Sequence, residues 1–453
     1  WAEQDPEDWW DSTVEAVREL VETCGIPRDG IGAIGFSGQM HGLVALDGEG
    51  QVLFPSILWC DQRTEEECAR ITEHFGRDRL RELTGNKALT GFTAPKVLWI
   101  KKHRPELFAR IRHILLPKDY VRFRLTGDFA TDMSDASGTL LLDVENRCWS
   151  EPMCSFLGVG KEVLPKLYES YEVTGRVSEG AKAALGLSGD ILVVGGAGDQ
   201  AAGAVGTGTV REGTVSVTLG TSGVVFAAHG SYAVDDDCRL HAFCHANGGY
   251  HSMGVMLSAA NCLKWWSDSV QDAVGLEVLL EEAEAVGTGS KVVFLPYLMG
   301  ERTPHADPDA KGCFLGMDMN TTRGHLTRAV LEGVAFGLRD SLEILRELEV
   351  PMEQVRVIGG GARSALWKQI LADVFGMELE EINTSQGGAL GAAILAGVGG
   401  GLFATVDEGC DRMIRVTGRI APVPENVAHY EQVYPSYRDA YGSLKDWFAG
   451  RGR

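Results

Sequence analysis

One acidic side chain directly follows a glycine-rich turn. Asp199 closes the run Gly195-Gly196-Ala197-Gly198 and is followed by Gln200. A carboxylate at the end of such a turn projects from the backbone and can take a proton from a substrate hydroxyl, as a general base does. Asp is also a common N-cap, and the helical pattern near Ala201 makes capping the simpler interpretation of this residue alone. Both roles stay open from the residues themselves.

Two more glycine-rich turns have the composition of phosphate- or nucleotide-binding loops. Thr218-Leu219-Gly220-Thr221-Ser222-Gly223 offers hydroxyl groups and backbone amides that can share the charge of a phosphate. Gly359-Gly360-Gly361-Ala362-Arg363-Ser364 follows an apolar run, and its bare backbone suits a flat nucleotide base. Neither a P-loop nor a dinucleotide fingerprint occurs where a strand passes into a helix, so those two fold classes lose support.

Cys238, His241, Cys244 and His245 are spaced closely enough to suggest a zinc site. Successive side chains on a strand point to opposite faces, so Cys244 and His245 do not easily face the same ion. We therefore expect no metal site built from these residues.

Four apolar, β-rich segments each end in a glycine turn and would position these residues. They are residues 31–38, 191–198, 215–223 and 355–361. Ligands of α/β sheets bind at the carboxyl ends of strands, so four such junctions favour a ligand site more than one does. The second pair begins after residue 211. We expect an α/β protein of two halves, residues 1–211 and 212–453, that face each other across a cleft.

The other elements fit mixed α/β content. Asp5 before Pro6, followed by apolar residues at helical spacing, predicts an initial helix. Residues 31–36 predict a buried strand, and residues 43–54 a hairpin around Asp47-Gly48-Glu49-Gly50. Residues 63–116 predict a mainly helical region that breaks near Pro105.

Composition narrows the class of protein. A chain of 453 residues is expected to form two or three domains, and a formal charge of −21 argues against a nucleic-acid partner. Ten cysteines without a Cys-x-x-Cys pair fit free thiols in a reducing cytoplasm. Residues 387–406 contain no charged side chain, but Gly and Ala dominate them, so we predict a buried helix and no membrane partner.

Two long spaced patterns occur in order along the chain. The first comprises Gly91, Thr93, Lys96, Val97, Trp99, Ile100, Lys102 and His103, and the second Gly312, Phe314, Gly316, Met317, His325, Leu326, Ala329 and Glu332. With residues 37–42, 58–63, 116–120 and 300–305, they make the chain similar, from end to end, to the FGGY family of carbohydrate kinases. That family belongs to the actin-like ATPases, and the resemblance is strongest to its members that act on xylulose.

The resemblance implies two actin-like (ribonuclease H-like) domains, a sugar-binding one followed by a nucleotide-binding one, and ATP-dependent phosphorylation of D-xylulose with Mg²⁺. By similarity Asp199 is the general base. Sugar-side candidates are Met40 and His41, then Gln39, Trp59, Asp61 and Gln200. Gly220 and Thr221 would meet the phosphates, and Gly360, Gly361 and Ala362 the adenosine. His41 and Trp59 also fit ordinary core positions.

The chain departs from the family pattern at its start. Family members begin with a hairpin that carries an Asp-x-Gly-Thr-type phosphate loop, whose Asp helps place magnesium, and no such segment precedes Trp1. We expect a first domain without its N-terminal hairpin, and a chain that is by itself weakly active or inactive. A longer natural protein is the interpretation we favour.

Two alternatives remain beside the xylulose kinase. One is a kinase for another sugar or polyol, such as ribulose, gluconate or glycerol, because a single hydroxyl contact can decide between them. The other is a non-catalytic sugar-binding module of the same fold. The expected partners are the sugar and ATP, and a homodimer is compatible with the sequence, which does not determine the oligomeric state.

Overall fold

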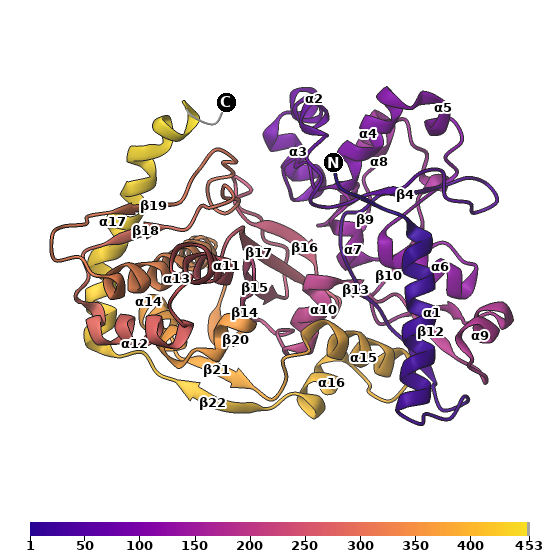
Figure 1. Ribbon diagram of the computed structural model, residues 1–453. Coiled ribbons are helices and arrows are strands. Elements are labelled where there is room, and N and C mark those ends of the chain that lie inside the picture. The colour runs from indigo at the N-terminus through magenta and orange to yellow at the C-terminus, as the bar shows by residue number, and fades with distance from the viewer. Residues whose placement is uncertain (451–453) are drawn as a thin grey trace.

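The computed structural model describes residues 1–450 and shows two halves side by side. In Figure 1 the N-terminal half, indigo to magenta, lies on the right, and the C-terminal half lies on the left. Helices α10, α15 and α16 lie between them, and the long helix α17 flanks the far side of the C-terminal half.

The N-terminal half contains mostly short elements. Its helices are α1 (Pro6–Thr23), α2 (Glu65–Phe75), α3 (Arg77–Thr84), α4 (Thr93–His103), α5 (Pro105–Phe108), α6 (Pro117–Thr126), α7 (Met133–Ser137), α8 (Glu151–Leu157), α9 (Glu179–Leu185), α10 (Asp199–Gly206) and the turn η1 (Lys161–Val163). Its strands are β1 (Glu3–Gln4), β2 (Ala33–Ile34), β3 (Ser37–Gly38), β4 (Val44–Leu46), β5 (Ser56–Ile57), β6 (His113–Leu115), β7 (Ala130–Asp132), β8 (Leu142–Asp143), β9 (Cys148–Trp149), β10 (Lys166–Tyr168), β11 (Val173–Arg176), β12 (Leu192–Val194) and β13 (Ala197–Gly198).

Several of these elements form where the sequence predicts them. Asp5 caps α1, because its side chain accepts a 3.0 Å hydrogen bond from the backbone N–H of Glu7, and Pro6 is the first helical residue. Helices α2 to α5 fill most of residues 63–116, and the chain breaks between α4 and α5 just before Pro105. The end of this region is a strand, β6, rather than a helix.

The predicted buried strand over residues 31–36 is wrong in length and burial. Strand β2 covers only Ala33 and Ile34, and both are partly exposed. It pairs in parallel with β12, which in turn pairs with β11, and no second strand pairs with β2 among residues 1–450. A strand with one paired edge has fewer backbone hydrogen bonds to extend it and less protein to bury it.

The predicted hairpin around residues 47–50 forms with a short second arm. The backbone N–H of Asp47 donates to the carbonyl of Gln51, which closes the turn, and Leu46 forms an antiparallel bridge with Val52. Strand β4 also forms a longer antiparallel ladder with β6, which lies at the end of the helical region. The residue pattern predicts the neighbouring arm but not this more distant partner.

The C-terminal half is built on one seven-stranded sheet with the order β16-β17-β15-β14-β20-β21-β22. Its strands are β14 (Gly213–Leu219), β15 (Gly223–His229), β16 (His241–Cys244), β17 (Tyr250–Met256), β20 (Met352–Ile358), β21 (Leu379–Ile382) and β22 (Val416–Ile420), with β18 (Val293–Leu295) and β19 (Cys313–Leu315) paired separately. Its helices are α11 (Ala260–Trp265), α12 (Leu276–Val286), α13 (Arg323–Glu347), α14 (Ala365–Phe375), α15 (Gly387–Gly399), α16 (Val406–Met413) and α17 (Pro424–Ala449), with the helical turns η2 (Trp266–Val270), η3 (Gly287–Gly289) and η4 (Gly360–Arg363).

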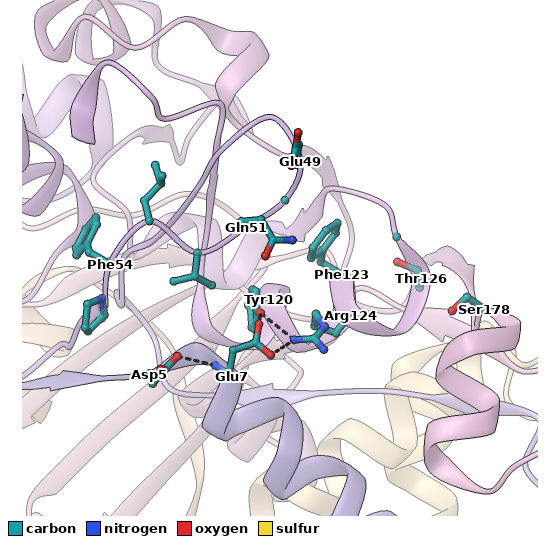
Figure 2. Close-up of a pocket in the computed structure, with 15 residues that line it drawn as sticks. Asp5, Glu7, Glu49, Gln51, Phe54, Tyr120, Phe123, Arg124, Thr126 and Ser178 are labelled. Carbon is teal, nitrogen blue, oxygen red and sulfur yellow. Dashed lines mark hydrogen bonds and ion pairs between the residues drawn. The ribbon is translucent and has the colours of Figure 1, made fainter. Parts of the chain in front are cut away.

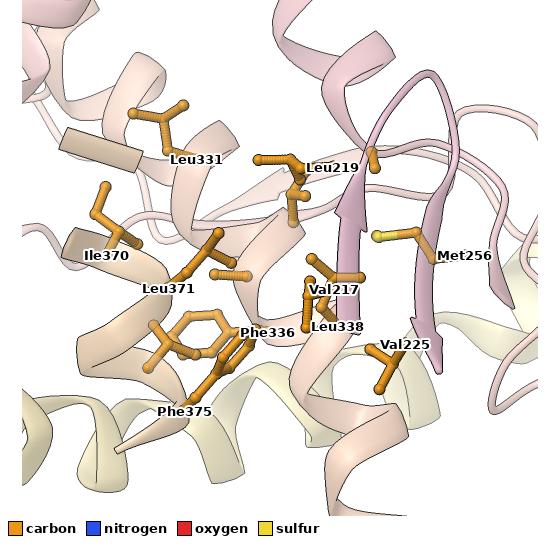
Figure 3. Packing of buried hydrophobic residues seen from close by; sticks show 14 of the residues in the cluster. Val217, Leu219, Val225, Met256, Leu331, Phe336, Leu338, Ile370, Leu371 and Phe375 are labelled. Atoms are coloured by element: carbon orange, nitrogen blue, oxygen red, sulfur yellow. The ribbon is translucent and has the colours of Figure 1, made fainter. Parts of the chain in front are cut away.

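This sheet has an antiparallel meander followed by parallel crossover strands. Strands β14, β15, β17 and β16 are antiparallel, whereas β14, β20 and β21 are parallel. Figure 3 shows its core, in which α13 and α14 pack apolar side chains against β14 and β15. The labelled members are Val217, Leu219, Val225, Met256, Leu331, Phe336, Leu338, Ile370, Leu371 and Phe375. Their burial makes the sheet a rigid base for the loops at its strand ends.

Helices α10 and α15 meet backbone to backbone and join the two halves. A Cβ atom on Gly391 of α15 would lie 1.8 Å from the carbonyl oxygen of Ala202 in α10, so only glycine fits there. The prediction of a packed, buried helix is therefore confirmed for residues 387–399, and its small residues are explained by this close approach. Within residues 1–450, no helix is long and apolar enough to cross a membrane.

Candidate active site

Two parallel strand ends bring the predicted base and the predicted sugar ligands together. Strands β3 and β13 pair in parallel, with Gly38 opposite Gly198. The residues that follow them, Met40 and His41 on one side and Asp199 on the other, therefore emerge at the same edge. Met40 packs on the Asp199 turn, because a Cβ on Gly198 would lie only 2.8 Å from the Met40 Cγ.

Asp199 is the first residue of α10, and its carboxylate contacts its neighbour. Its Oδ1 accepts from the backbone N–H of Gln200 at 3.0 Å, and its Oδ2 accepts from the Gln200 side-chain amide at 3.2 Å. The residue is exposed to solvent, yet burial by the surrounding protein raises the pKa of its carboxyl, against the lowering effect of the Gln200 hydrogen bonds. An accessible carboxylate of raised basicity suits a proton acceptor.

His41 is held in one tautomer and one orientation. Its Nδ1 lies 2.6 Å from the carbonyl oxygen of Gly138, and since a carbonyl only accepts, Nδ1 carries the proton. Burial lowers the pKa of His41 to about 3, although the Gly138 bond opposes this, so the ring is neutral. Its Nε2 is then the ring nitrogen that can accept a hydrogen bond.

The His41 backbone has a left-handed conformation that two donors support. Its φ is 69°, a conformation that L-residues other than Gly seldom adopt. Its carbonyl oxygen accepts from the Thr93 hydroxyl at 3.0 Å and from the Lys96 ammonium at 2.8 Å. Thr93 and Lys96 belong to the first long sequence pattern, but nothing in their spacing revealed that they orient His41.

Lys96 is buried and has no carboxylate in hydrogen-bond contact. Its ammonium also donates to the carbonyl oxygen of Gly91 at 2.6 Å, and the side chain is 0% exposed. Burial lowers the pKa of Lys96 to about 7, with the charge of Asp61 acting in the opposite direction. The amine thus serves as a donor to main-chain oxygens of the sugar-side loops.

The other sugar-side candidates differ in availability. Trp59 is 46% exposed, so its ring is free to lie against a ligand. Asp61 is 1% exposed, and its two carboxylate oxygens accept hydrogen bonds from Arg63 and from the backbone N–H of Ala2. Its role as a sugar ligand stays a prediction that this geometry does not favour. The Gln39 amide donates to the side chain of Gln4 at 3.0 Å.

The two predicted nucleotide loops are neighbours. Strands β14 and β20 are parallel, with Thr218 opposite Ile358, so the loops at their carboxyl ends adjoin. A Cβ on Gly359, whose φ is 97°, would lie 2.6 Å from the Leu219 carbonyl oxygen, so the loops pack directly on one another. Thr221 and Gly360 are exposed, and a Cβ on Gly360 would meet no atom within 4 Å.

The backbone of these loops is partly engaged in their own turns, since the N–H of Gly220 donates to the carbonyl of Ser222 and the N–H of Ala362 to that of Gly359. Gly220 and Thr221 lie in the turn between β14 and β15. The last paired residues before this turn are Leu219 and Gly223. Gly361 and Ala362 lie in the helical turn η4 and are partly exposed. A hairpin turn beside a glycine turn is the arrangement that the sequence predicted for phosphates and adenosine.

One hydrophobic cluster contains residues of both halves and lies near the predicted sugar ligands and the predicted phosphate turn. It contains Met40 and Phe92 from the N-terminal half together with Val224, Phe243 and Met253 from β15, β16 and β17. The loops with the predicted sugar ligands thus share a hydrophobic cluster with β15, which borders the turn at Gly220 and Thr221. This packing sets both groups on a common base.

A buried ionic group, which we call the Lys118 cluster, adjoins the Asp199 turn. The Lys118 ammonium lies 2.6 Å from Asp119, 2.9 Å from Asp132 and 3.5 Å from Asp135, and all four side chains are at most 2% exposed. Burial alone would lower the pKa of Lys118, but the three carboxylates raise it. Burial raises the pKa of Asp135 well above its ordinary value. Ser134 bridges the cluster to the turn, since its hydroxyl contacts Asp132 and accepts from the Gly198 N–H.

Three of the four residues that resemble a zinc set have separate hydrogen-bond partners. The Cys244 thiol donates to the Val144 carbonyl, His245 contacts the Thr209 carbonyl, and His241 contacts Asn86. Over residues 1–450, no group of three or more His, Cys, Asp or Glu side chains is arranged to hold a metal ion.

A surface pocket of about 820 Å³ lies outside this site. Figure 2 shows that α1, α6 and the loop of residues 49–55 form it, with Glu7 bound to Tyr120 and Arg124 on one wall. None of the candidate sugar or nucleotide residues lines it. Pocket size therefore does not locate the site that the strand ends define.

Two α/β halves, one with a carboxylate at the end of a strand pair and the other with a glycine-rich hairpin, fit the class of phosphotransferases. Models of the FGGY family of carbohydrate kinases match the chain, the N-terminal domain over residues 1–206 and the C-terminal domain over residues 215–400. The chain belongs to this family.

Similar proteins align with this chain over nearly its whole length. A xylulose kinase from Bacillus subtilis is 40% identical over 448 residues, which cover 98% of this chain and 90% of that protein. The crystal structure of a "xyloylose kinase" from Brucella ovis has a TM-score of 0.90 and 38% identity, covering 99% of this chain and 92% of that one. A gluconate kinase from Lactobacillus acidophilus has a TM-score of 0.93 and 27% identity, covering 98% and 90%.

Proposed function

We propose that the protein transfers the γ-phosphoryl group of ATP to the terminal hydroxyl of D-xylulose, with Asp199 as the general base. The observation that supports the proposal is the parallel pairing of β3 with β13, because Met40 and His41 follow one strand and Asp199 follows the other at the same edge, with Met40 packed on Gly198. The xylulose kinases among the similar proteins support the choice of sugar. The boundary between the sugar-binding and nucleotide-binding domains, at residues 211 and 212, stays part of the same proposal.

In this mechanism the sugar hydroxyl oxygen attacks the γ-phosphorus of ATP, and the bond to the β-phosphate oxygen breaks to release ADP. Asp199 accepts the hydroxyl proton, which becomes acidic as the new P–O bond forms. Neutral His41 accepts a hydrogen bond from another sugar hydroxyl through Nε2 and fixes the sugar relative to Asp199. Gly220 and Thr221 lie against the phosphates, with the Thr221 hydroxyl as a donor to a phosphate oxygen, and Gly360, Gly361 and Ala362 lie against the adenosine.

A divalent metal ion, Mg²⁺ in this proposal, would neutralise charge on the transferring phosphates. Within residues 1–450 no three His, Cys, Asp or Glu side chains are arranged to hold a metal ion, and Asp199 is the exposed carboxylate of the candidate site. The ion would therefore take most of its ligands from phosphate oxygens and water. That pattern is normal for Mg²⁺ at nucleotide sites. We place the reaction in the cytoplasm, in keeping with ten cysteines that are all free.

The test measures ADP formation by the full-length protein with D-xylulose, ribulose, gluconate and glycerol as separate acceptors. The proposal expects the highest kcat/KM with D-xylulose. A higher value with gluconate would instead assign the activity suggested by the likeness to the gluconate kinase. Tight sugar binding by calorimetry without ADP formation from any acceptor would favour a non-catalytic binding module.

A further inference from the structure

Arg302 is a cation near the sugar-side residues whose guanidinium has no hydrogen-bonded partner among residues 1–450, although the charge of the neighbouring Glu301 acts on it. Its guanidinium makes no hydrogen bond, ion pair or ring contact with any residue from 1 to 450, although the residue is only partly exposed. Glu301, its neighbour, directs Oε1 to the backbone N–H groups of Leu257 and Arg302 and not to the guanidinium. An unpaired guanidinium with restricted access to water is costly unless a ligand supplies acceptors.

The loop that carries Arg302 is anchored on both sides. The Thr303 backbone N–H donates to the Val255 carbonyl at 2.9 Å, and the Thr303 hydroxyl donates to the Arg239 carbonyl at 3.0 Å. The Glu301 backbone pairs with Asp307 through two 2.8 Å hydrogen bonds. These bonds hold the backbone of residue 302 beside β17 and the segment that leads into β16.

A line of contacts connects this loop to the predicted sugar ligands. His241, two residues after the Arg239 carbonyl that binds Thr303, has its ring 5.7 Å from that of Phe92. The Phe92 ring lies edge-on at 4.9 Å from the His41 ring. The positive charge of Arg302 adds to burial in lowering the pKa values of both His41 and His241, in keeping with a guanidinium close to the two rings.

We propose that Arg302 is the contact that the C-terminal half makes with the sugar, at the end remote from Asp199. The guanidinium donates hydrogen bonds to the carbonyl or hydroxyl oxygens of that end, while His41 and Asp199 hold the sugar from the N-terminal half. Because the contact comes from the other half, it also requires the two halves to be together around the sugar. The inference rests on the proposed function and adds a specificity-determining residue to it.

The test compares Arg302→Met and Arg302→Lys with wild type in the full-length protein. Loss of hydrogen bonds from a charged donor predicts that Arg302→Met lowers kcat/KM for D-xylulose by about 10- to 100-fold, with KM for ATP within about twofold of wild type. Arg302→Lys, which keeps a cation, should fall between them. Arg18→Met removes an exposed arginine of α1 and is the matched control, with no effect on either constant.

The outcomes separate the two proposals. If wild type forms no ADP in the presence of any sugar, the proposed function fails before Arg302 is tested. If wild type is active and Arg302→Met keeps its kcat/KM for D-xylulose within twofold, the Arg302 inference is overturned and the proposed function stands. Equal losses in the constants for sugar and ATP, together with a lower melting temperature, would show a structural role and also overturn it.

Discussion

A single methyl group at Gly391 is expected to separate the two helices that join the halves. In Gly391→Ala the new Cβ would lie 1.8 Å from the Ala202 carbonyl oxygen and 3.0 Å from the Gly206 nitrogen, both backbone atoms of α10. Real Cβ contacts are essentially never shorter than 3.0 Å, so α10 and α15 must move apart by at least about 1 Å. Neither clashing atom is a flexible side chain, so the shift cannot be absorbed locally.

Both stability and catalysis should change. Overpacking of this kind costs roughly 1–3 kcal/mol of the free energy of unfolding. Because α10 begins with Asp199, a displacement of about 1 Å also misplaces the base and predicts a loss of about 100-fold in kcat. Denaturant unfolding and steady-state ADP formation measure the two effects on the same preparation.

Gly203 of α10, the helix that Gly391 contacts, provides the matched control. A Cβ at Gly203 would meet no atom within 4 Å, so Gly203→Ala should keep kcat and raise stability by about 0.5–1 kcal/mol, as expected for a helix-interior glycine. Wild-type kcat and stability in Gly391→Ala would refute the close helix contact. Equal damage from both substitutions would show that glycine in α10 and α15 matters for another reason.

Three more outcomes are expected. Thr93→Val removes one donor to the His41 carbonyl and should raise KM for the sugar by about 2- to 10-fold without changing KM for ATP. Thr93→Ser should restore the KM for the sugar. Steady-state kinetics in which both KM values rise together would contradict this. Since burial raises the pKa of Asp199, kcat/KM should fall as the pH drops through a midpoint above the ordinary Asp value of about 4, and a profile that stays flat through pH 4 would contradict this. Lys118→Met should cost about 3–5 kcal/mol of unfolding free energy near neutral pH. The cost should be smaller in acid, because burial raises the pKa values of Asp119 and Asp135 and their protonation removes the unpaired charge; equal stability of mutant and wild type at pH 7 would disprove the role of the Lys118 cluster.

Local chemistry and residue patterns predicted the backbone structure correctly where a short segment decides it. The hairpin turn at Gly220 and Thr221 and the glycine turn at Gly360 form where small residues predict them. A helix also begins at Asp199, as the pattern near Ala201 indicated. In each case the backbone conformation is decided by residues within a few positions.

Contacts between residues far apart in the chain could not be predicted from the sequence. No local signal tells that Lys96 donates to the His41 carbonyl or that Gly391 touches Ala202, because these contacts depend on how distant elements pack. Arg302 shows the same limit, since its lack of a hydrogen-bonded partner is visible only once the loop is placed. The strand over residues 31–36 was overpredicted because its apolar residues do not reveal how many edges of the strand are paired.

The most direct test of the account is the activity of Asp199→Asn. Asparagine has nearly the same shape as aspartate but cannot take the hydroxyl proton, so D-xylulose-dependent ADP formation should fall by about 10²- to 10⁴-fold while the affinity for ATP is kept. An Asp199→Asn enzyme with kcat within threefold of wild type would contradict the assignment of Asp199 as the base.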